Sequence, residues 1–106
     1  MPRRRTQPPR RVRILNLTWK VKFVNNDIGD SLGWCDYESQ TITLYAQQTK
    51  ESLCDTFLHE LLHALFYAMA IDQSTDEEKL VASTSTGLCA VWKQNPEAFK
   101  WWASML

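Results

Sequence analysis

Residues 59–63 read His-Glu-Leu-Leu-His and lie within the apolar run 53–69, Leu-Cys-Asp-Thr-Phe-Leu-His-Glu-Leu-Leu-His-Ala-Leu-Phe-Tyr-Ala-Met. Residues four apart lie on the same face of an α-helix, so the imidazoles of His59 and His63 can both reach one metal ion. They are the only two histidines of the chain. The carboxylate of Glu60 would lie beside that metal, where it can accept a proton from a bound water. The run therefore predicts a buried helix with one metal-binding face.

Length and composition limit the rest of the molecule to one domain. The chain has 106 residues, of which 44% are hydrophobic and 23% charged, as in ordinary globular proteins. No apolar run is long enough to span a bilayer, and no apolar segment follows the basic N-terminus, so we expect neither a membrane helix nor a secretory signal. The three cysteines, Cys35, Cys54 and Cys89, form no C-x-x-C pair. They indicate a reducing compartment such as the cytoplasm, and we expect each to be a small buried side chain.

The basic residues are concentrated at the N-terminus. Six of the twelve Lys and Arg residues are arginines among the first 13 residues, and the chain from residue 14 onward has six basic and twelve acidic side chains. We interpret residues 1–11, which are also proline-rich, as a disordered basic arm and residues 12–106 as the single domain. The arm could bind nucleic acid or an acidic partner, or it could be a solvated leader that aids solubility. Its candidate contact residues are Arg3, Arg4, Arg5, Arg10 and Arg11.

Hydrophobic periodicity predicts strands before the histidine helix. Apolar residues alternate with polar ones over residues 12–23, as in a strand with one buried face. Residues 32–37 and 41–45 are two β-rich runs separated by three polar residues, which predicts a hairpin. The predicted fold class is therefore α+β, with a small antiparallel or mixed sheet of about three strands.

Further helices flank the sheet. The histidine helix should cover residues 51–70, with Thr49 as its N-cap. The segment 71–76 should end the histidine helix and begin a second helix that runs to about residue 93, with a capping box formed either by Ser74 and Glu77 or by Thr75 and Glu78. Asn95 and Pro96 resemble the N-cap and first residue of a short C-terminal helix, whose Trp101 and Trp102 we expect to close the core.

The histidine motif can be interpreted in two ways. It can arise by chance on an amphipathic helix whose histidines are only hydrogen-bonded. Burying two imidazoles and a carboxylate is costly unless a metal satisfies them, which favours a zinc site. Zinc needs a third protein ligand, and Phe66 and Met69 occupy the positions where an extended metzincin motif has glycine and histidine.

A carboxylate after the histidine helix is therefore the expected third ligand. The candidates are Asp72, Asp76, Glu77 and Glu78. If Ser74 caps the second helix, Glu77 is used in the capping box and Glu78 is free to bind zinc; the other register reverses these roles. We predict Glu78, with Glu77 as the alternative.

The order of these segments resembles a known group of proteins. The quoted segments are Gly-Trp-Cys-Asp-Tyr at 33–37, Thr-Ile-Thr-Leu at 41–44, the HELLH region at 56–64, Glu77-Glu78-x-x-Val81, Gly87-Leu88 and Asn95-Pro96. Together they resemble the small zinc-metallopeptidase-like proteins of phages and prophages, related to the ImmA/IrrE and SprT-like groups. The resemblance covers about residues 32–102, and HELLH is its specific part. It implies a minimal zincin-like fold, zinc bound by His59, His63 and an acid matching Glu78, and Glu60 as general base. The polar run 83–86 departs from the small or aliphatic residues usual there.

Two functions follow as hypotheses. The first is a phage- or prophage-encoded zinc metallopeptidase that acts on a protein partner in the host cytoplasm and binds its substrate as an added strand along residues 41–45. The second is a weakly active or inactive zinc-stabilised regulatory module that binds a host protein or nucleic acid through the arginine-rich arm. A purely structural zinc site does not need Glu60, which favours the enzyme. Tyr37, Tyr45 and Tyr67 are the candidate oxyanion donors.

Overall fold

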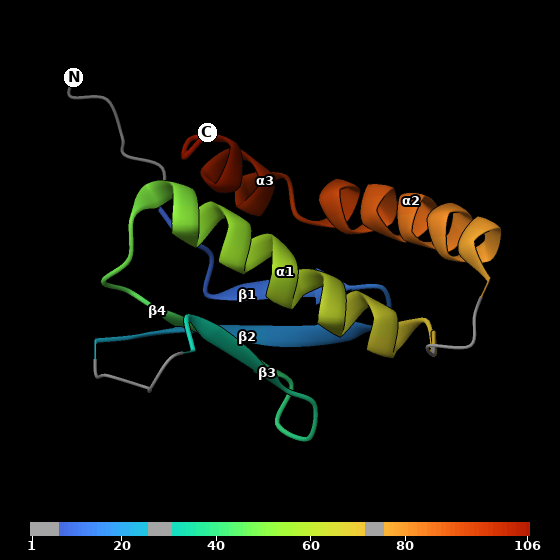
Figure 1. Cartoon of the computed structure of the whole chain (residues 1–106), viewed down its shortest axis with the longest axis horizontal. Coiled ribbons are helices and arrows are strands. Elements are labelled where there is room, and N and C mark those ends of the chain that lie inside the picture. The colour runs from blue at the N-terminus through green and yellow to red at the C-terminus, as the bar shows by residue number, and fades with distance from the viewer. Residues whose placement is uncertain (1–6, 26–30, 72–75) are drawn as a thin grey trace.

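The structure, a computed structural model, describes residues 7–25, 31–71 and 76–106, and within the second helix it leaves out the side chains of residues 77, 78, 81 and 82. In these residues three helices lie on one side of a four-stranded sheet (Figure 1). The elements are β1 (Arg11–Ile14), β2 (Leu17–Val24), β3 (Gly33–Asp36), β4 (Thr41–Tyr45), α1 (Lys50–Ala68), α2 (Glu77–Gln94) and α3 (Pro96–Ala103). The strand order is β1-β2-β4-β3, and β2 and β4 run parallel while the other neighbours are antiparallel. The α+β class is confirmed, with four strands instead of three.

The predicted single strand over residues 12–23 is wrong, because the chain turns back at Leu15 and Asn16. Leu15 adopts a left-handed conformation with φ of 58°, and Ile14 pairs with Leu17 across this two-residue turn. Partners across a hairpin face the same side of the sheet, so Val12 and Trp19 are both buried. The alternation of apolar and polar residues therefore continues through the turn without a break. For this reason the sequence pattern does not reveal the turn.

The predicted hairpin of residues 32–37 and 41–45 is confirmed as β3 and β4. Its turn is held by Asp36, whose Oδ1 accepts hydrogen bonds from the backbone N–H groups of Glu38 (3.1 Å) and Ser39 (3.4 Å). However, β4 lies between β2 and β3, so both of its edges are already paired. The expectation that a peptide binds along residues 41–45 is therefore wrong, and the outer strands of the sheet are β1 and β3.

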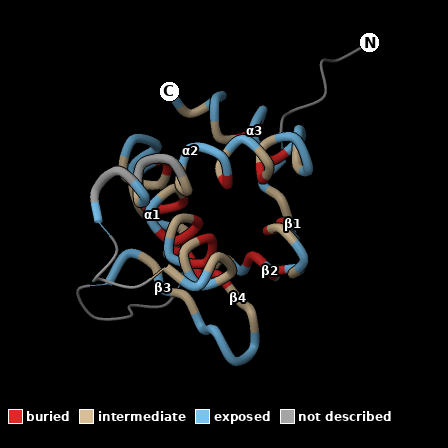
Figure 2. Tube along the Cα trace, turned by 90° about the vertical axis from the view of Figure 1, so that its right-hand side faces the viewer, coloured by how far each residue is buried: buried red, intermediate tan, exposed pale blue. Residues whose placement is uncertain are grey.

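Helix α1 is central, as predicted, and Thr49 is its N-cap, since the Thr49 hydroxyl accepts a hydrogen bond from the N–H of Ser52 at 3.1 Å. Its buried face packs on the sheet, and Figure 2 shows the buried segments of α1 and the strands facing one another. Trp101 of α3 closes this core with an edge-on contact to Phe57, their ring centroids 5.1 Å apart. The core residues are Val12, Ile14, Trp19, Val21, Ile42, Leu44, Phe57, Leu61, Ala64, Leu65, Val91 and Trp101.

Helix α2 begins differently from the prediction. Its N-cap is Asp76, whose Oδ1 accepts from the N–H of Lys79 at 2.9 Å, so neither capping box forms. Three consecutive residues, Ser74, Thr75 and Asp76, are all good N-cap types, and the last of them takes the role. Glu77 and Glu78 become the first two residues of the helix.

Pro96 opens α3 as predicted, but Asn95 makes no side-chain cap. Its side-chain amide pairs instead with Arg13 of β1: Nδ2 donates to the Arg13 carbonyl (2.6 Å) and Oδ1 accepts from the Arg13 N–H (2.8 Å). Gln94 makes longer bonds of the same kind to Leu15, at 3.2 and 3.3 Å. The junction of α2 and α3 thus covers the outer edge of β1.

The cysteines differ in their exposure. The three cysteines are free, but only Cys54 is fully buried, while Cys35 is half-buried and Cys89 is exposed on α2, so the expectation of burial is wrong for Cys89. Among the described residues, no helix combines the length and apolarity needed to cross a bilayer.

Candidate metal centre

His59 and His63 lie together on the solvent-facing side of α1, and both are exposed, so the expectation that the two imidazoles are buried is wrong. Their Nε2 atoms are 3.1 Å apart, and their ring planes are inclined at 76°. Two nitrogens bound to one tetrahedral zinc at 2.0–2.1 Å are about 3.3 Å apart, so this pair fits two positions of such a site. Two neutral imidazoles could also share a hydrogen bond at this distance. The geometry expected from the four-residue spacing is therefore present.

Glu60 lies next to the two histidines around the same helix turn, on the flank of α1 that faces β3. It is only 7% exposed, and the thiol of Cys35 on β3 lies against it, with Sγ donating to the Glu60 backbone carbonyl at 3.0 Å. Burial is the largest of the effects that raise the pKa of Cys35 to about 12; the negative charge of the nearby Glu60 carboxylate and a hydrogen bond with it act in the same direction. Cys35 is consequently a neutral thiol at neutral pH, and it packs beside the proposed base.

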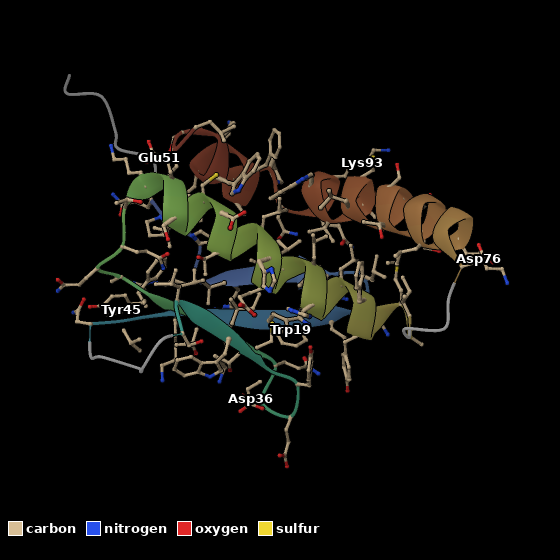
Figure 3. The ribbon with its side chains drawn as sticks, in the orientation of Figure 1. Trp19, Asp36, Tyr45, Glu51, Asp76 and Lys93 are labelled. Carbon is tan, nitrogen blue, oxygen red and sulfur yellow. The ribbon has the colours of Figure 1, made fainter. Side chains whose placement is uncertain are left out.

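Three aromatic rings border this region at the C-terminal half of α1. Tyr37, at the start of the β3–β4 turn, stacks on Tyr67 of α1 with centroids 4.8 Å apart. Both rings meet Trp19 of β2 edge-on, at 6.0 and 6.3 Å, and Figure 3 shows Trp19 beneath this part of α1. Tyr67 follows His63 by one helical turn, so the tyrosine pair extends the histidine face.

Tyr37 is close enough to the buried acid for its ionisation to be affected. Burial raises the pKa of the Tyr37 hydroxyl, and the charges of Cys35 and Glu60 raise it further. The phenol therefore remains a hydrogen-bond donor over a wider pH range. Of the three predicted oxyanion candidates, Tyr37 and Tyr67 come together here, whereas Tyr45 pairs with Val24 at the opposite end of β2 (Figure 3).

The described side chains bring the two candidate ligands, His59 and His63, together and add no third. Among them, no group of three or more His, Cys, Asp or Glu residues is placed to hold a metal ion. The carboxylate of Asp76 caps α2. Asp72 and the side chains of Glu77 and Glu78 lie outside the described part of the structure. The third ligand, Glu78 or Glu77, stays a prediction.

The packing of α2 adds a condition to that prediction. A Cβ at Gly87 would lie 2.8 Å from Met69 Sδ and 3.1 Å from Leu65 Cδ1, so α2 contacts α1 closely at this point. Glu78 precedes Gly87 by nine residues, about 13 Å along the helix axis. It lies toward the end of α2 marked by Asp76 in Figure 3. The backbone of Glu78 therefore lies well away from the point where α2 meets Leu65 and Met69 of α1.

The polar run 83–86 lies on α2 beside an open cavity. Ser83 and Thr86 line an open cavity of about 390 Å³ together with Leu15, Met69, Gly87 and Ala90. The Thr84 hydroxyl is buried and has no hydrogen-bond partner among the described residues. These small residues thus lie on the same part of α2 as Gly87, where that helix contacts α1 closely.

The predicted contact residues of the N-terminal arm are described in part. Arg10 and Arg11 lie at the start of β1, and Arg11 is already a strand residue, while Arg3, Arg4 and Arg5 are outside the described residues. Arg10 and Arg11 line one depression with Lys20 and Lys22 of β2 and another with residues 94–98, which include Glu97. In the sheet, β1 lies at the opposite edge from β3 and Cys35.

The chain as a whole matches no protein-family model, no curated protein and no solved structure.

Proposed function

We propose that the chain is a zincin-like metallopeptidase in which His59 and His63 bind zinc and Glu60 is the general base. The observation that carries the proposal is the 3.1 Å separation of the two Nε2 atoms, on the same helix turn as a buried carboxylate. A carboxylate from the segment 72–78, with Glu78 as the first choice, completes the ligand set. The partner would be a protein or peptide substrate.

The roles of the side chains follow from their positions. When bound, zinc supplies a Lewis acid and a water whose pKa is lowered to about 7. A Glu60 carboxylate oxygen accepts the proton of the attacking water and passes it to the nitrogen of the leaving amine. Cys35 keeps Glu60 against β3 without itself carrying a charge.

Strand β3 is the element that best suits substrate binding. It is an edge strand, and its Cys35 contacts Glu60, so a peptide paired with β3 would pass beside the base. The protonated hydroxyl of Tyr37, just after β3, is the donor best placed to stabilise negative charge on the substrate carbonyl.

Metal analysis combined with matched variants tests the proposal. The purified protein should contain about one zinc per chain, and His59→Gln or His63→Gln should lose it. Asp55→Asn, an exposed residue one turn before His59, is the control and should retain zinc. A wild-type protein that is folded but takes up no zinc would contradict the metal site.

Activity is tested separately with a library of internally quenched fluorescent peptides. Glu60→Gln should retain zinc and lose hydrolysis by a factor of about 100 or more, because the proton acceptor is missing. Hydrolysis that survives this substitution would show that Glu60 is not the base. If the wild-type protein binds zinc but cleaves no peptide in the library, the result would support a metal-stabilised module instead of an enzyme.

A further inference from the structure

We propose that the open face of the sheet binds single-stranded nucleic acid. This basic face consists of Arg11, Arg13, Lys20, Lys22 and Trp34. The helices lie on the other side of the sheet (Figures 1 and 2). The inference goes beyond the proposed function, since it requires neither zinc nor Glu60.

The alternation of side chains places every cation of β1 and β2 on this face. In β1, Val12 and Ile14 are buried while Arg11 and Arg13 are exposed. In β2, the buried Trp19 and Val21 alternate with the exposed Thr18, Lys20 and Lys22. Neither strand contains an acidic residue, so their open side carries positive charge only.

Strand register brings Trp34 onto the same face. Lys22 pairs with Thr43, and Thr43 pairs with Trp34, so the three form one row across the sheet. Adjacent strands are about 4.8 Å apart, which places the Cα atoms of Lys22 and Trp34 about 10 Å from each other. Cys35, the next residue of β3, contacts α1, and Trp34 therefore faces the opposite way, with 40% of its surface exposed.

A second row shows where the positive charge ends. Arg11 pairs with Lys20, Lys20 with Thr41, and Thr41 with Asp36. Asp36 is the acidic member of this row, at the far edge of the sheet, and its Oδ1 accepts hydrogen bonds from the backbone of its own turn.

The cations are not neutralised within the described structure. The ion pair found there joins Lys100 and Glu97 on α3, and no described carboxylate lies within 4.0 Å of a Lys or Arg of β1 or β2. Arg13 donates instead to the Thr18 hydroxyl at 2.8 Å. Arg10 and Arg11 line an open depression of about 650 Å³ with Thr18, Lys20 and Lys22. The positive charge is therefore available to a ligand.

The sequence extends this charge, because the first 26 residues contain eight Lys and Arg residues and no Asp or Glu. A polymer of phosphates complements such a surface. Trp34 selects among polyanions: a single strand can stack an unpaired base on its ring, whereas a duplex keeps its bases stacked inside and an acidic peptide has none. The complementary ligand is thus a single strand of DNA or RNA.

Fluorescence anisotropy with the full chain tests the proposal. The probes are labelled oligomers of about 20 units: single-stranded DNA, single-stranded RNA, duplex DNA and polyglutamate. Both single strands, or one of them, should bind most tightly, with an affinity that falls as salt is raised. Preference for one of them identifies the natural polymer.

Paired variants locate the site. Lys20→Gln/Lys22→Gln should weaken binding about tenfold or more and reduce the slope of log affinity against log salt by about 1.4. Lys79→Gln/Lys93→Gln, with the same charge change on exposed positions of α2, should have little effect. Trp34→Ala should weaken single-strand binding about fivefold or more. Its control is Phe99→Ala, which removes a ring of similar exposure (41%) from α3.

Three results would overturn the proposal. Equal weakening by the two lysine pairs would show that only net charge matters. Equally tight binding of duplex DNA or polyglutamate would remove the case for single strands. Binding that is lost on deletion of residues 1–9 but unaffected by Lys20→Gln/Lys22→Gln would place the contact in the arm alone. Glu60→Gln should bind as the wild type does, which keeps this test independent of the metal site.

Discussion

The thiol of Cys35 donates a hydrogen bond to the backbone carbonyl of Glu60 at 3.0 Å and so ties an edge strand to the centre of α1. The contact joins residues 25 positions apart in sequence. It places a neutral, polarizable side chain between the sheet and the proposed base. The ionisation of this thiol is a direct probe of that packing.

Cys35 should resist alkylation and should make stability depend on pH in the alkaline range. Its folded-state pKa of about 12 lies above the ordinary value of 9.0, so the folded state holds the proton more tightly than the unfolded state. The contribution of Cys35 to stability is therefore complete below pH 9 and is lost as the pH rises toward 12. Urea unfolding between these values should show a fall in stability that is smaller in Cys35→Ala. Iodoacetamide at pH 8 should modify the exposed Cys89 first, and rapid modification of Cys35 in the folded protein would contradict the buried contact.

Glu78→Gln should weaken zinc binding by a factor of about 10 to 100, as measured by competition with a chelator, because the substitution removes an anionic ligand. Glu77→Gln is the matched control on the adjacent residue of α2 and should have little effect. The reverse result would assign the ligand to Glu77. If neither change affects zinc affinity, the third ligand is not on α2.

Asn95→Ala should reduce the free energy of unfolding by about 1–3 kcal/mol, because it removes three hydrogen bonds, two to the backbone of Arg13 and one to the Val91 carbonyl. Gln94→Ala removes only the two longer bonds to Leu15 and should cost less. Chemical denaturation of both variants provides the comparison. Equal losses would mean that the amide of Asn95 has no special role.

Gly87→Ala should destabilise the protein by about 1–3 kcal/mol despite the better helix propensity of alanine, because the new methyl group would overlap Met69 and press on Leu65. Adding Met69→Ala should recover part of this loss, which is a coupling between touching residues. Ser85→Ala, an exposed position on the same helix, is the control and should be neutral or slightly stabilising. A stabilising Gly87→Ala would show that α2 packs less closely on α1.

The histidine helix could be predicted from sequence because its determinants are local. The apolar period, the Thr49 cap and the four-residue histidine spacing all act within a few turns of one helix. The start of α2 could not be chosen, since three adjacent residues could each serve as its cap. The turn at Leu15 could not be recognised either, because the apolar pattern runs through it and only Asn16 is a typical turn residue.

The surroundings of the motif depend on contacts that sequence spacing does not reveal. Cys35, Tyr37 and Trp19 reach α1 through strand order and register, and β4 inserts between β2 and β3. Hydrophobic alternation assigns faces to a strand but does not say which strand will be its neighbour. For this reason the substrate edge was predicted on the wrong strand, while the two histidines and Glu60 were placed on one helix turn.

The amide of Asn95 meets Arg13 with one donor and one acceptor, as the peptide group of a neighbouring strand would. At this edge of the sheet, the backbone of β1 is therefore hydrogen-bonded by a side chain of the same molecule. When copies of a protein form a fibre by pairing their sheets, each copy needs two unpaired edge strands, one for each of its two neighbours. Among the described strands only β3 keeps an uncovered edge, so pairing through these strands stops after two copies, and a peptide that binds at β3 competes with that pairing.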